Sequence, residues 1–353
     1  MDELASHPRQ NGRIILTGHD HAIFTELQLD GRLPFTALAE RVGLSEAHVR
    51  RRVKWLTEAD VFAVTAVAHP SLLGLSCMAW IGLDVRPSAI ETVAKELVHT
   101  SGIDYVVISS GRFNVMCEVA CEDSGALDPL VLGLRRIDGV ERSETFVYLA
   151  LRHQQFQWLS ARHGRETGSP DTKGVTESTN QLDPLDIAII RELERDGRAS
   201  FRDIARKLDV SERAVSGRFT QLVDDGVLKV IAVGNPLNLG FEAMTWLGIT
   251  LRSDADHDDV CSRLAAIPSI DYVVVPSGRY DLMAEAVCRD RNELLVALTR
   301  DIGAIKGIAH VESFLYLRLL YQSTAGAWGV GRSRARPSQN GPVVTRPGRT
   351  AVQ

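Results

Sequence analysis

Basic side chains gather in one short stretch of the chain, GLSEAHVRRRVKWL at residues 43–56, and could bind a nucleic acid there. In order they are His48, Arg50, Arg51, Arg52 and Lys54. Arginine and lysine can neutralise phosphates, and arginine can donate two hydrogen bonds to a guanine edge. A solvated, charged helix face is the alternative, so the elements that carry these residues must decide between the two.

The stretch belongs to a unit that the chain contains twice. A shift of 166 residues, from Gly31 to Gly197, superimposes the two copies of this segment. The matching segments are 31–62 with 197–228, 103–121 with 270–288, and 144–151 with 312–319. Two copies in the same order indicate an internal duplication, so both copies are expected to fold in the same way.

Hydrophobic spacing predicts three short helices at the start of each copy, which together are called a head. The first helix is marked by Ile23 and Leu27 in copy one, and by Ile187, Ile190 and Leu193 in copy two. The second spans 35–42 or 201–208. A tight turn, Gly43-Leu44 or Asp209-Val210, separates it from the third.

The third helix is predicted to begin after Ser45 or Ser211, whose hydroxyl can accept a hydrogen bond from an exposed backbone N–H. Its inward stripe is Val49, Val53 and Leu56 in copy one, and Val215, Phe219 and Leu222 in copy two. Helix, short helix, turn and capped helix form the helix-turn-helix pattern, in which the last helix enters the major groove.

We therefore expect the outward face of the third helix to contact double-stranded DNA. The candidate DNA-binding residues are Ser45, Glu46, Ala47, His48, Arg50, Arg51, Arg52 and Lys54, and in copy two Ser211, Arg213, Ser216, Gly217, Arg218 and Thr220. The second face is much less basic, and Gly217 costs its helix about 1 kcal/mol relative to alanine. The pattern predicts an asymmetric DNA site in which the first head dominates the affinity.

Strands and helices alternate after each head. Strands are predicted at 78–85 and 243–251, helices at 88–99 and 255–266, then two strands joined by a Gly-Arg turn. The next amphipathic helix carries Leu127, Leu130, Val131, Leu134 and Ile137, or Leu294, Leu295, Leu298 and Ile302, and a last strand follows it. The order β-α-β-β-α-β is that of the ferredoxin-like sandwich. Because its open sheet face would expose an apolar patch, the two sheets are expected to cover each other as an intramolecular pseudo-dimer.

The predicted fold class is therefore α+β, with two kinds of domain. Winged-helix or helix-turn-helix domains are predicted at 14–68 and 182–234, and ferredoxin-like effector and oligomerisation domains at 72–157 and 238–321. Residues 158–181, rich in glycine, serine, threonine and charge, are predicted to be a flexible linker. Residues 322–353 are predicted to be a disordered basic tail, either solvated or in weak contact with DNA phosphates.

Composition restricts the protein class. The net charge of −5 means that DNA contact must come from a local basic patch. The cysteines are odd in number and include no C-x-x-C pair, which favours a reduced, cytoplasmic setting. Cys117 and Cys121 lie in a strand pattern and are expected to be buried rather than to bind a metal. No stretch approaches the roughly 18 apolar residues of a membrane span, and no motif indicates a signal peptide, a cofactor, a metal site or a catalytic group.

The combined pattern resembles the Lrp/AsnC (feast/famine) transcriptional regulators over roughly residues 14–157 and 182–321. The resemblance is strongest in copy two, in the head, in NPLNLG and in SGRYDLMAEAVCRD. It implies DNA binding by the head, sensing of an amino acid or related small molecule by the ferredoxin-like domain, and assembly into homo-oligomers, with one fused chain in place of a dimer. Copy one departs from the family pattern at Asp60, where copy two has Gly226, and at Asn114, where copy two has Asp281.

The hairpin turns are the predicted effector site. The candidates are Gly111, Arg112, Asn114, Gly278, Arg279 and Asp281. Glycine permits close approach of a ligand to the backbone, arginine can pair with a carboxylate, and Asp281 could hold an ammonium group. The alternatives are that these are ordinary turn residues with solvated arginines, and that Asp281 only fixes the hairpin.

Two other functions compete with transcriptional regulation. Tetrapyrrole decarboxylases of the sirohaem type combine the same two domains, but neither hairpin here, SSGRFNVMCEV or PSGRYDLMAEA, contains a histidine. We therefore expect no enzyme activity. The second competitor is a ligand-binding or oligomerisation module whose heads no longer bind DNA.

Overall fold

The computed structural model describes residues 9–10, 13–14, 16–59, 61–68, 70–154 and 182–322. Asp60, the predicted linker and all of the predicted tail beyond residue 322 lie outside the described residues. A short hairpin, β1 (Arg9–Gln10) and β2 (Arg13–Ile14), precedes the first head.

The two heads have the predicted three-helix order. Head one contains α1 (Gly18–Leu29), α2 (Phe35–Val42) and α3 (Glu46–Glu58), and head two contains α8 (Pro184–Arg195), α9 (Phe201–Leu208) and α10 (Glu212–Asp224). Thr17 and Asp183 begin the first helices with capping boxes, a device that satisfies exposed backbone N–H groups. In α8 the fully buried side chains of the apolar face are Ile189, Ile190 and Leu193, whereas Ile187 is only half-buried.

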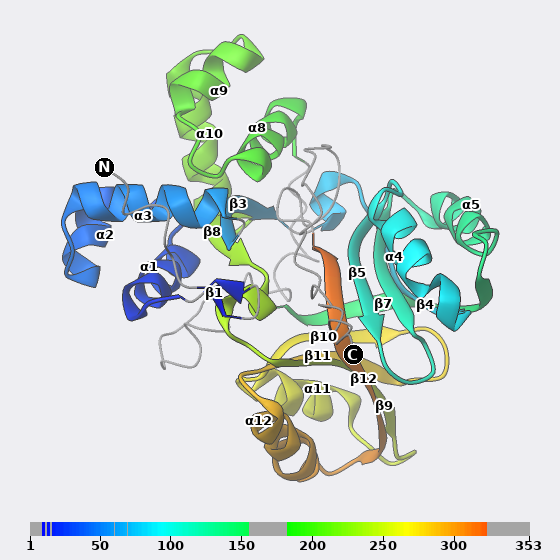
Figure 1. The fold of residues 1–353 in the computed structure, drawn as a ribbon. Helices are drawn as coiled ribbons and strands as arrows, with labels where there is room; N and C mark the ends of the chain where they lie inside the picture. Colours follow the sequence, from blue (N-terminus) through cyan, green and yellow to red (C-terminus); the bar gives the residue numbers. More distant parts are fainter. Residues whose placement is uncertain are drawn as a thin grey trace, which may run out of the picture.

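One strand from each half joins the heads. Strand β3 (Phe62–Ala68) follows head one and pairs antiparallel with β8 (Leu228–Gly234), which follows head two. The pairing runs from Phe62 opposite Gly234 to Ala68 opposite Leu228. The heads therefore lie next to each other, over a two-stranded ribbon that neither half could form alone (Figure 1).

Each ferredoxin-like unit has the predicted β-α-β-β-α-β order. Unit one is β4 (Cys77–Val85), α4 (Ile90–Val98), β5 (Ile103–Ser109), β6 (Val115–Cys121), α5 (Ser124–Leu134) and β7 (Val140–Gln154). Unit two is β9 (Ala243–Leu251), α11 (His257–Ala265), β10 (Ile270–Pro276), β11 (Leu282–Cys288), α12 (Arg291–Val296) and β12 (Ile308–Gln322). Short 3-10 turns, Pro70–Leu73 and Pro236–Leu239, lead into the two units.

The two sheets do more than cover each other, because they join edge to edge into a closed barrel. The strand order is β10-β11-β9-β12-β5-β6-β4-β7, and β7 pairs with β10 to close it. Strands β7 and β12 are 15 residues long, and their second halves cross into the opposite unit. Figure 1 shows β12 running from the lower unit up to β5. The pseudo-dimer is thus held by two backbone ladders, β7 with β10 and β12 with β5, each interrupted by shifts of register.

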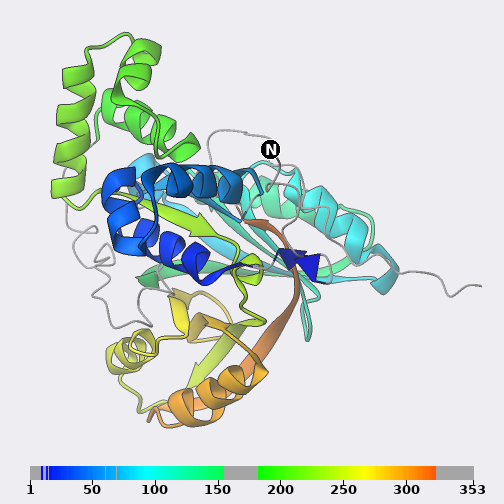
Figure 2. The same ribbon diagram turned by 60° about the vertical axis from the view of Figure 1, so that its left-hand side comes forward.

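The barrel interior is apolar and aromatic, and the helices lie outside it (Figure 2). Trp80 and Trp246 meet there edge to face with ring centroids 4.9 Å apart. On the outside, the helices of each unit cover a separate apolar layer. Leu295 was predicted to belong to the apolar face of its helix, and this prediction is wrong, since its side chain is 59% exposed. Helix α12 passes after Val296 into a π-helical turn (Ala297–Ile302), which changes the helical register and leaves Leu294, Leu298 and Ile302 to face the sheet.

Candidate nucleic-acid interface and hairpin site

The third helix of head one presents its basic face to solvent. Ser45 caps α3 by accepting a hydrogen bond from the backbone N–H of His48 at 3.3 Å, while Val49, Val53 and Leu56 are buried. On the opposite side, exposed positions are occupied by Ala47, His48, Arg50, Arg51 and Lys54. The apolar stripe therefore fixes the rotation of the helix and turns these side chains outward.

The partners of the exposed basic residues are local. Arg50 binds Glu46 at 2.7 Å and Lys54 lies 3.8 Å from Glu58, both one helical turn away and both in exposed pairs. Such surface pairs stabilise a helix by only about 0.5 kcal/mol, so a phosphate can displace the carboxylate at little cost. The Arg50 guanidinium also lies 4.5 Å from the centre of the Phe35 ring, which holds the side chain across the start of α2.

Arg52 differs from its neighbours, and the structure contradicts its assignment as a DNA contact. Its side chain is 13% exposed and pairs with Asp20 at the start of α1, which is 1% exposed. The second contact of this pair, from Nη2 to Oδ2, measures 2.6 Å. Burial alone would raise the pKa of Asp20, but hydrogen bonds from Arg52 and Thr17 outweigh it and hold that pKa below its ordinary value. Arg52 therefore fixes α3 against α1.

Head two repeats this arrangement with a weaker basic face. Ser211 caps α10 through the N–H of Ala214 at 3.1 Å, and Arg213, Gly217 and Thr220 are exposed, with Ser216 half-buried. Arg218, the counterpart of Arg52, binds Asp183 at 2.8 Å and Asp186 at 3.3 Å. At 40% exposure Arg218 is less enclosed than Arg52. Only Arg213 remains as an exposed basic candidate on this face.

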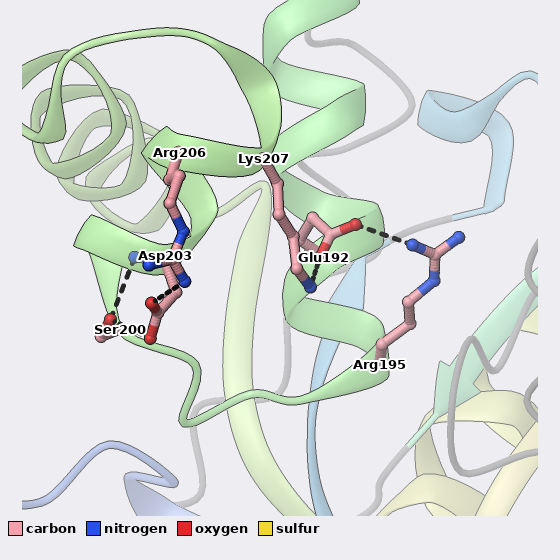
Figure 3. Close-up of polar contacts among 6 residues, drawn as sticks. All are labelled: Glu192, Arg195, Ser200, Asp203, Arg206 and Lys207. Atoms are coloured by element: carbon pink, nitrogen blue, oxygen red, sulfur yellow. Dashed lines mark hydrogen bonds and ion pairs between the residues drawn. The ribbon is translucent and has the colours of Figure 1, made fainter.

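A carboxylate on the first helix of each head holds the second helix, a feature that the sequence analysis missed. Glu192 on α8 accepts from Lys207 of α9 at 2.6 Å and from Arg195 at 2.7 Å (Figure 3). In head one Glu26 binds Arg41 at 2.8 Å. The equal separation of acid and base in the two copies could have indicated the contact. Because α9 and α2 support the turns before the third helices, these pairs help to set the angle of each DNA-facing helix.

Figure 3 also shows how α9 begins. Ser200 Oγ accepts a hydrogen bond from the Asp203 N–H at 3.0 Å and donates one to the Asp203 carboxylate at 2.7 Å. Arg206 binds the same carboxylate at 2.6 Å. Helix α2 lacks such a cap because Pro34 stands at its N-cap position.

Each hairpin turn contains a glycine whose backbone conformation favours that residue. Gly111 and Gly278 have φ of +103° and +110°, a region that side chains rarely adopt. The following aromatic rings fold onto glycines of the first strands: a Cβ on Gly82 would lie 2.5 Å from the Phe113 ring, and one on Gly248 would lie 2.6 Å from the Tyr280 ring. The turns are therefore fixed to the sheet.

Asn114 and Asp281 hold these hairpins in place. Asp281 accepts a hydrogen bond from the Leu251 N–H at 2.7 Å. Asn114 accepts from the Val85 N–H at 2.9 Å and donates to the Val85 carbonyl at 2.7 Å. Both side chains thus perform the structural role that was the alternative to effector binding, while the exposed Asp281 also presents a negative charge.

The hairpin arginines pair across the two halves. Arg279 binds Glu144 at 2.6 Å, a contact that raises the pKa of the arginine, and Arg112 lies 3.3 Å from Glu312. Glu312 also accepts from the Tyr280 hydroxyl at 2.6 Å, whereas the counterpart of that tyrosine, Phe113, has no hydroxyl. A carboxylate effector at either arginine would have to compete with one of these glutamates.

Two glutamates inside the barrel were not anticipated. Glu118 accepts from Tyr148 at 2.7 Å and Tyr272 at 3.2 Å, while Glu285 accepts from Tyr105 at 3.0 Å and from Tyr316. Each glutamate therefore receives one tyrosine from each half. Burial raises the pKa of each carboxyl to about 7, and the charge of Glu285 adds to the effect at Glu118. A single glutamate at the same place in two apolar strands, VMCEVAC and LMAEAVC, was the available signal.

No cluster of metal-ligating side chains occurs within the described residues. All five cysteines are buried and none of them forms a disulfide, and burial raises the pKa of the Cys117 thiol, as expected for a structural residue. None of the helices in the described part of the chain is long and apolar enough to cross a membrane.

The matched domains identify the family. Residues 16–57 and 182–223 match the AsnC-type helix-turn-helix domain, and residues 76–155 and 242–325 match the Lrp/AsnC ligand binding domain. The chain belongs to the Lrp/AsnC family of transcriptional regulators, with the family's two-domain unit present twice.

Individual relatives match less than half of this chain, whereas one solved structure matches most of it. An uncharacterized HTH-type transcriptional regulator of Pyrococcus abyssi is 31% identical over 153 residues, which is 43% of this chain and 92% of the relative. The HTH-type transcriptional regulator LrpA of Pyrococcus horikoshii is 33% identical over 125 residues, or 35% of this chain and 89% of LrpA. The siroheme decarboxylase NirDL, solved with an iron-uroporphyrin III analogue, matches with a TM-score of 0.57 and 16% identity over 88% of this chain and 96% of that one. At this identity the likeness to NirDL is one of fold alone.

Proposed function

We propose that this chain is a sequence-specific DNA-binding regulator that presents two unequal heads to one duplex. The observation that carries the proposal is the outward placement of Arg50, Arg51 and Lys54 on α3, the helix that the helix-turn-helix motif directs at the major groove. Arg52 lies in the same basic run but pairs with the buried carboxylate of Asp20, whereas the side chains of the other three residues face solvent. Head two contributes fewer charges and contacts the second half-site more weakly.

A salt titration of DNA binding tests this proposal. Duplex selected from a random library by the wild-type protein is bound at increasing salt, and the slope of log affinity against log salt is measured for wild type and for a variant with Arg50, Arg51 and Lys54 changed to alanine. Each phosphate contact contributes about 0.9 to the slope, so the variant should bind at least about tenfold more weakly with a shallower slope.

The matched control for this titration is Arg86→Ala with Arg142→Ala, two exposed arginines of the ferredoxin-like unit that pair with Asp138 and Asp84. The control should bind as wild type does. Equal binding by the α3 variant and the wild type would contradict the proposal, and would favour a module whose heads no longer bind DNA.

We also propose that the hairpins sense an amino acid or a related small molecule, with Asp281 holding its ammonium group. Asp281→Asn is the informative substitution, because Asn114 holds the equivalent hairpin of copy one with an amide. The variant should keep its melting temperature and lose binding in isothermal titration against a panel of amino acids. The reciprocal Asn114→Asp variant should gain a second site. Unchanged binding by Asp281→Asn would remove that charge from the site.

Enzyme activity is not part of this proposal. The siroheme decarboxylase shares the fold, but the hairpins here present Phe113 and Tyr280 and contain no histidine. Incubation with an iron tetrapyrrole of the sirohaem type should leave its absorption spectrum unchanged, whereas loss of carboxylate from the tetrapyrrole would establish the decarboxylase instead.

Light scattering would test the further proposal that fused chains pair with one another in solution.

A further inference from the structure

The two heads exchange arginines at their junction. Arg32 follows α1 and donates through Nη1 to the Gly197 carbonyl at 2.6 Å and the Ala199 carbonyl at 3.1 Å. Arg198 follows α8 and donates to the carbonyls of Gly31 at 2.6 Å and Leu33 at 3.0 Å. Each guanidinium therefore binds the backbone of the other head at the turn between the first and second helices.

Backbone contacts place these turns against the joined strands. The Gly31 N–H donates to the Val230 carbonyl on β8, and the Gly197 N–H donates to the Val64 carbonyl on β3, both at 2.8 Å. A Cβ on either glycine would lie 2.9 Å from a backbone nitrogen of the opposite half, so the approach has no room for a side chain. Head one thus contacts the strand of head two, and head two the strand of head one.

Aromatic rings extend each arginine contact to a DNA-facing helix. Arg32 lies over Phe201 at 4.5 Å and over Phe219 of α10 at 5.3 Å. Arg198 lies 4.2 Å from the centre of the Phe35 ring, and Arg50 of α3 lies 4.5 Å from the same ring. Desolvation of the guanidinium groups, seen in the lowered pKa of both arginines, strengthens such contacts.

We propose that Arg32 and Arg198 lock the two heads into one body, fix the distance and orientation between α3 and α10, and thereby set the half-site spacing that the chain accepts. The clause on spacing rests on the proposed DNA-binding function, whereas the lock itself does not. The two contacts are unequal, because Val53 stands where head two has Phe219. Arg32 contacts α10 of head two directly, at the Phe219 ring. Arg198 reaches α3 of head one only through Phe35 and Arg50. Loss of Arg32 should therefore free α10 more than loss of Arg198 frees α3.

Distances between spin labels on the two heads test the lock without DNA. Thr57→Cys on α3 and Val223→Cys on α10 are exposed counterparts, and the five native cysteines are all buried. The lock predicts one narrow distance distribution for this labelled chain and a broad one when Arg32→Met and Arg198→Met are added. The same change at Arg86 and Arg206, which bind exposed carboxylates within their own domains, is the matched control and should leave the distribution narrow.

The lock also makes a separate prediction about DNA. Changing the spacer of the selected duplex by two base pairs rotates one half-site by about 70° and should weaken wild-type binding about tenfold. The variant without the two arginines should lose less than about threefold. If the methionine pair does not fold by circular dichroism, Arg32→Lys with Arg198→Lys replaces it, since lysine keeps the charge but lacks the planar group that serves two carbonyls and a ring.

The outcomes of the two experiments separate cleanly. An unchanged narrow distribution in the folded methionine or lysine pair would overturn the lock. A broadened distribution with an unchanged spacing preference would support the lock and overturn its role in spacing. If the wild type selects and binds no duplex, the proposed function fails, while the spin-label distances still decide whether the heads are locked.

Discussion

Replacing Glu285 by glutamine should make the barrel less sensitive to pH. The carboxyl is buried and accepts hydrogen bonds from Tyr105 and Tyr316, while Asp271 and Glu118 are the nearby acidic groups. Its pKa is about 7 in place of the ordinary 4.5. Ionisation is therefore less favourable in the folded chain than in the unfolded chain by on the order of 3 kcal/mol.

The sign of the pH dependence follows from the raised pKa. The stability associated with Glu285 is fully present below pH 4.5, is lost as the pH rises through about 7, and changes little above that. Glutamine stays neutral and its amide oxygen can still accept a tyrosine hydrogen bond. Glu285→Gln should therefore match the wild type near pH 4.5 and exceed its free energy of unfolding at pH 8 by up to about 3 kcal/mol.

Urea unfolding between pH 4.5 and 8.5 measures this difference. The fluorescence of Trp80 and Trp246 reports on the barrel interior when Trp55, Trp158 and Trp328 are replaced by phenylalanine. Glu242→Gln, at an exposed glutamate of the same unit, is the control and should follow the wild type at every pH. A difference between wild type and Glu285→Gln that stays constant across this range would refute the reasoning.

Three further predictions concern the heads and the sheet. Asp20→Asn should destabilise head one by about 3 kcal/mol in thermal unfolding, because it leaves the nearly buried Arg52 without its carboxylate. The equivalent change in head two, Asp186→Asn, should destabilise that head less, because Arg218 is 40% exposed and still pairs with Asp183. Equal losses of stability in the two heads would contradict this account. Gly82→Ala should destabilise unit one by about 1–3 kcal/mol, since its Cβ would lie 2.5 Å from the Phe113 ring, and an unchanged melting temperature would count against that packing. Gly217→Ala should instead stabilise head two by about 1 kcal/mol, because no atom lies within 4 Å of the new methyl group, and a lower melting temperature would be the contrary result.

Much of the fold could be predicted because it is determined by local patterns that the chain repeats. The caps Ser45 and Ser211, the turns at Gly43 and Asp209, and the first three strands of each unit lie where the hydrophobic spacing placed them. The closure of the barrel could not be predicted in this way. The second halves of β7 and β12 contain polar residues such as Arg152 and Arg318, and only pairing with the other half makes them strands.

The candidate site was predicted in outline, and its errors come from contacts between distant elements. Arg52 follows two exposed arginines in sequence, but Asp20 of another helix draws it inward. Arg112 and Arg279 were expected to be solvated or to bind an effector, yet each has a glutamate of the opposite half within reach. Glu118 and Glu285 carry no motif, and their importance depends on tyrosines that the closed barrel brings to them.

An exchange of the two outward faces tests the central claim most directly. Positions 47, 50, 51 and 54 of α3 receive Arg, Ser, Gly and Thr, and positions 213, 216, 217 and 220 of α10 receive Ala, Arg, Arg and Lys. Iron-EDTA attached to Thr57→Cys of head one then cleaves the half-site that head one occupies on a selected duplex whose half-sites differ. Two unequal heads on one barrel predict that the exchange reverses the chain on the duplex, so cleavage moves from the strongly protected half-site to the other one. Cleavage that stays at the same half-site would contradict that account.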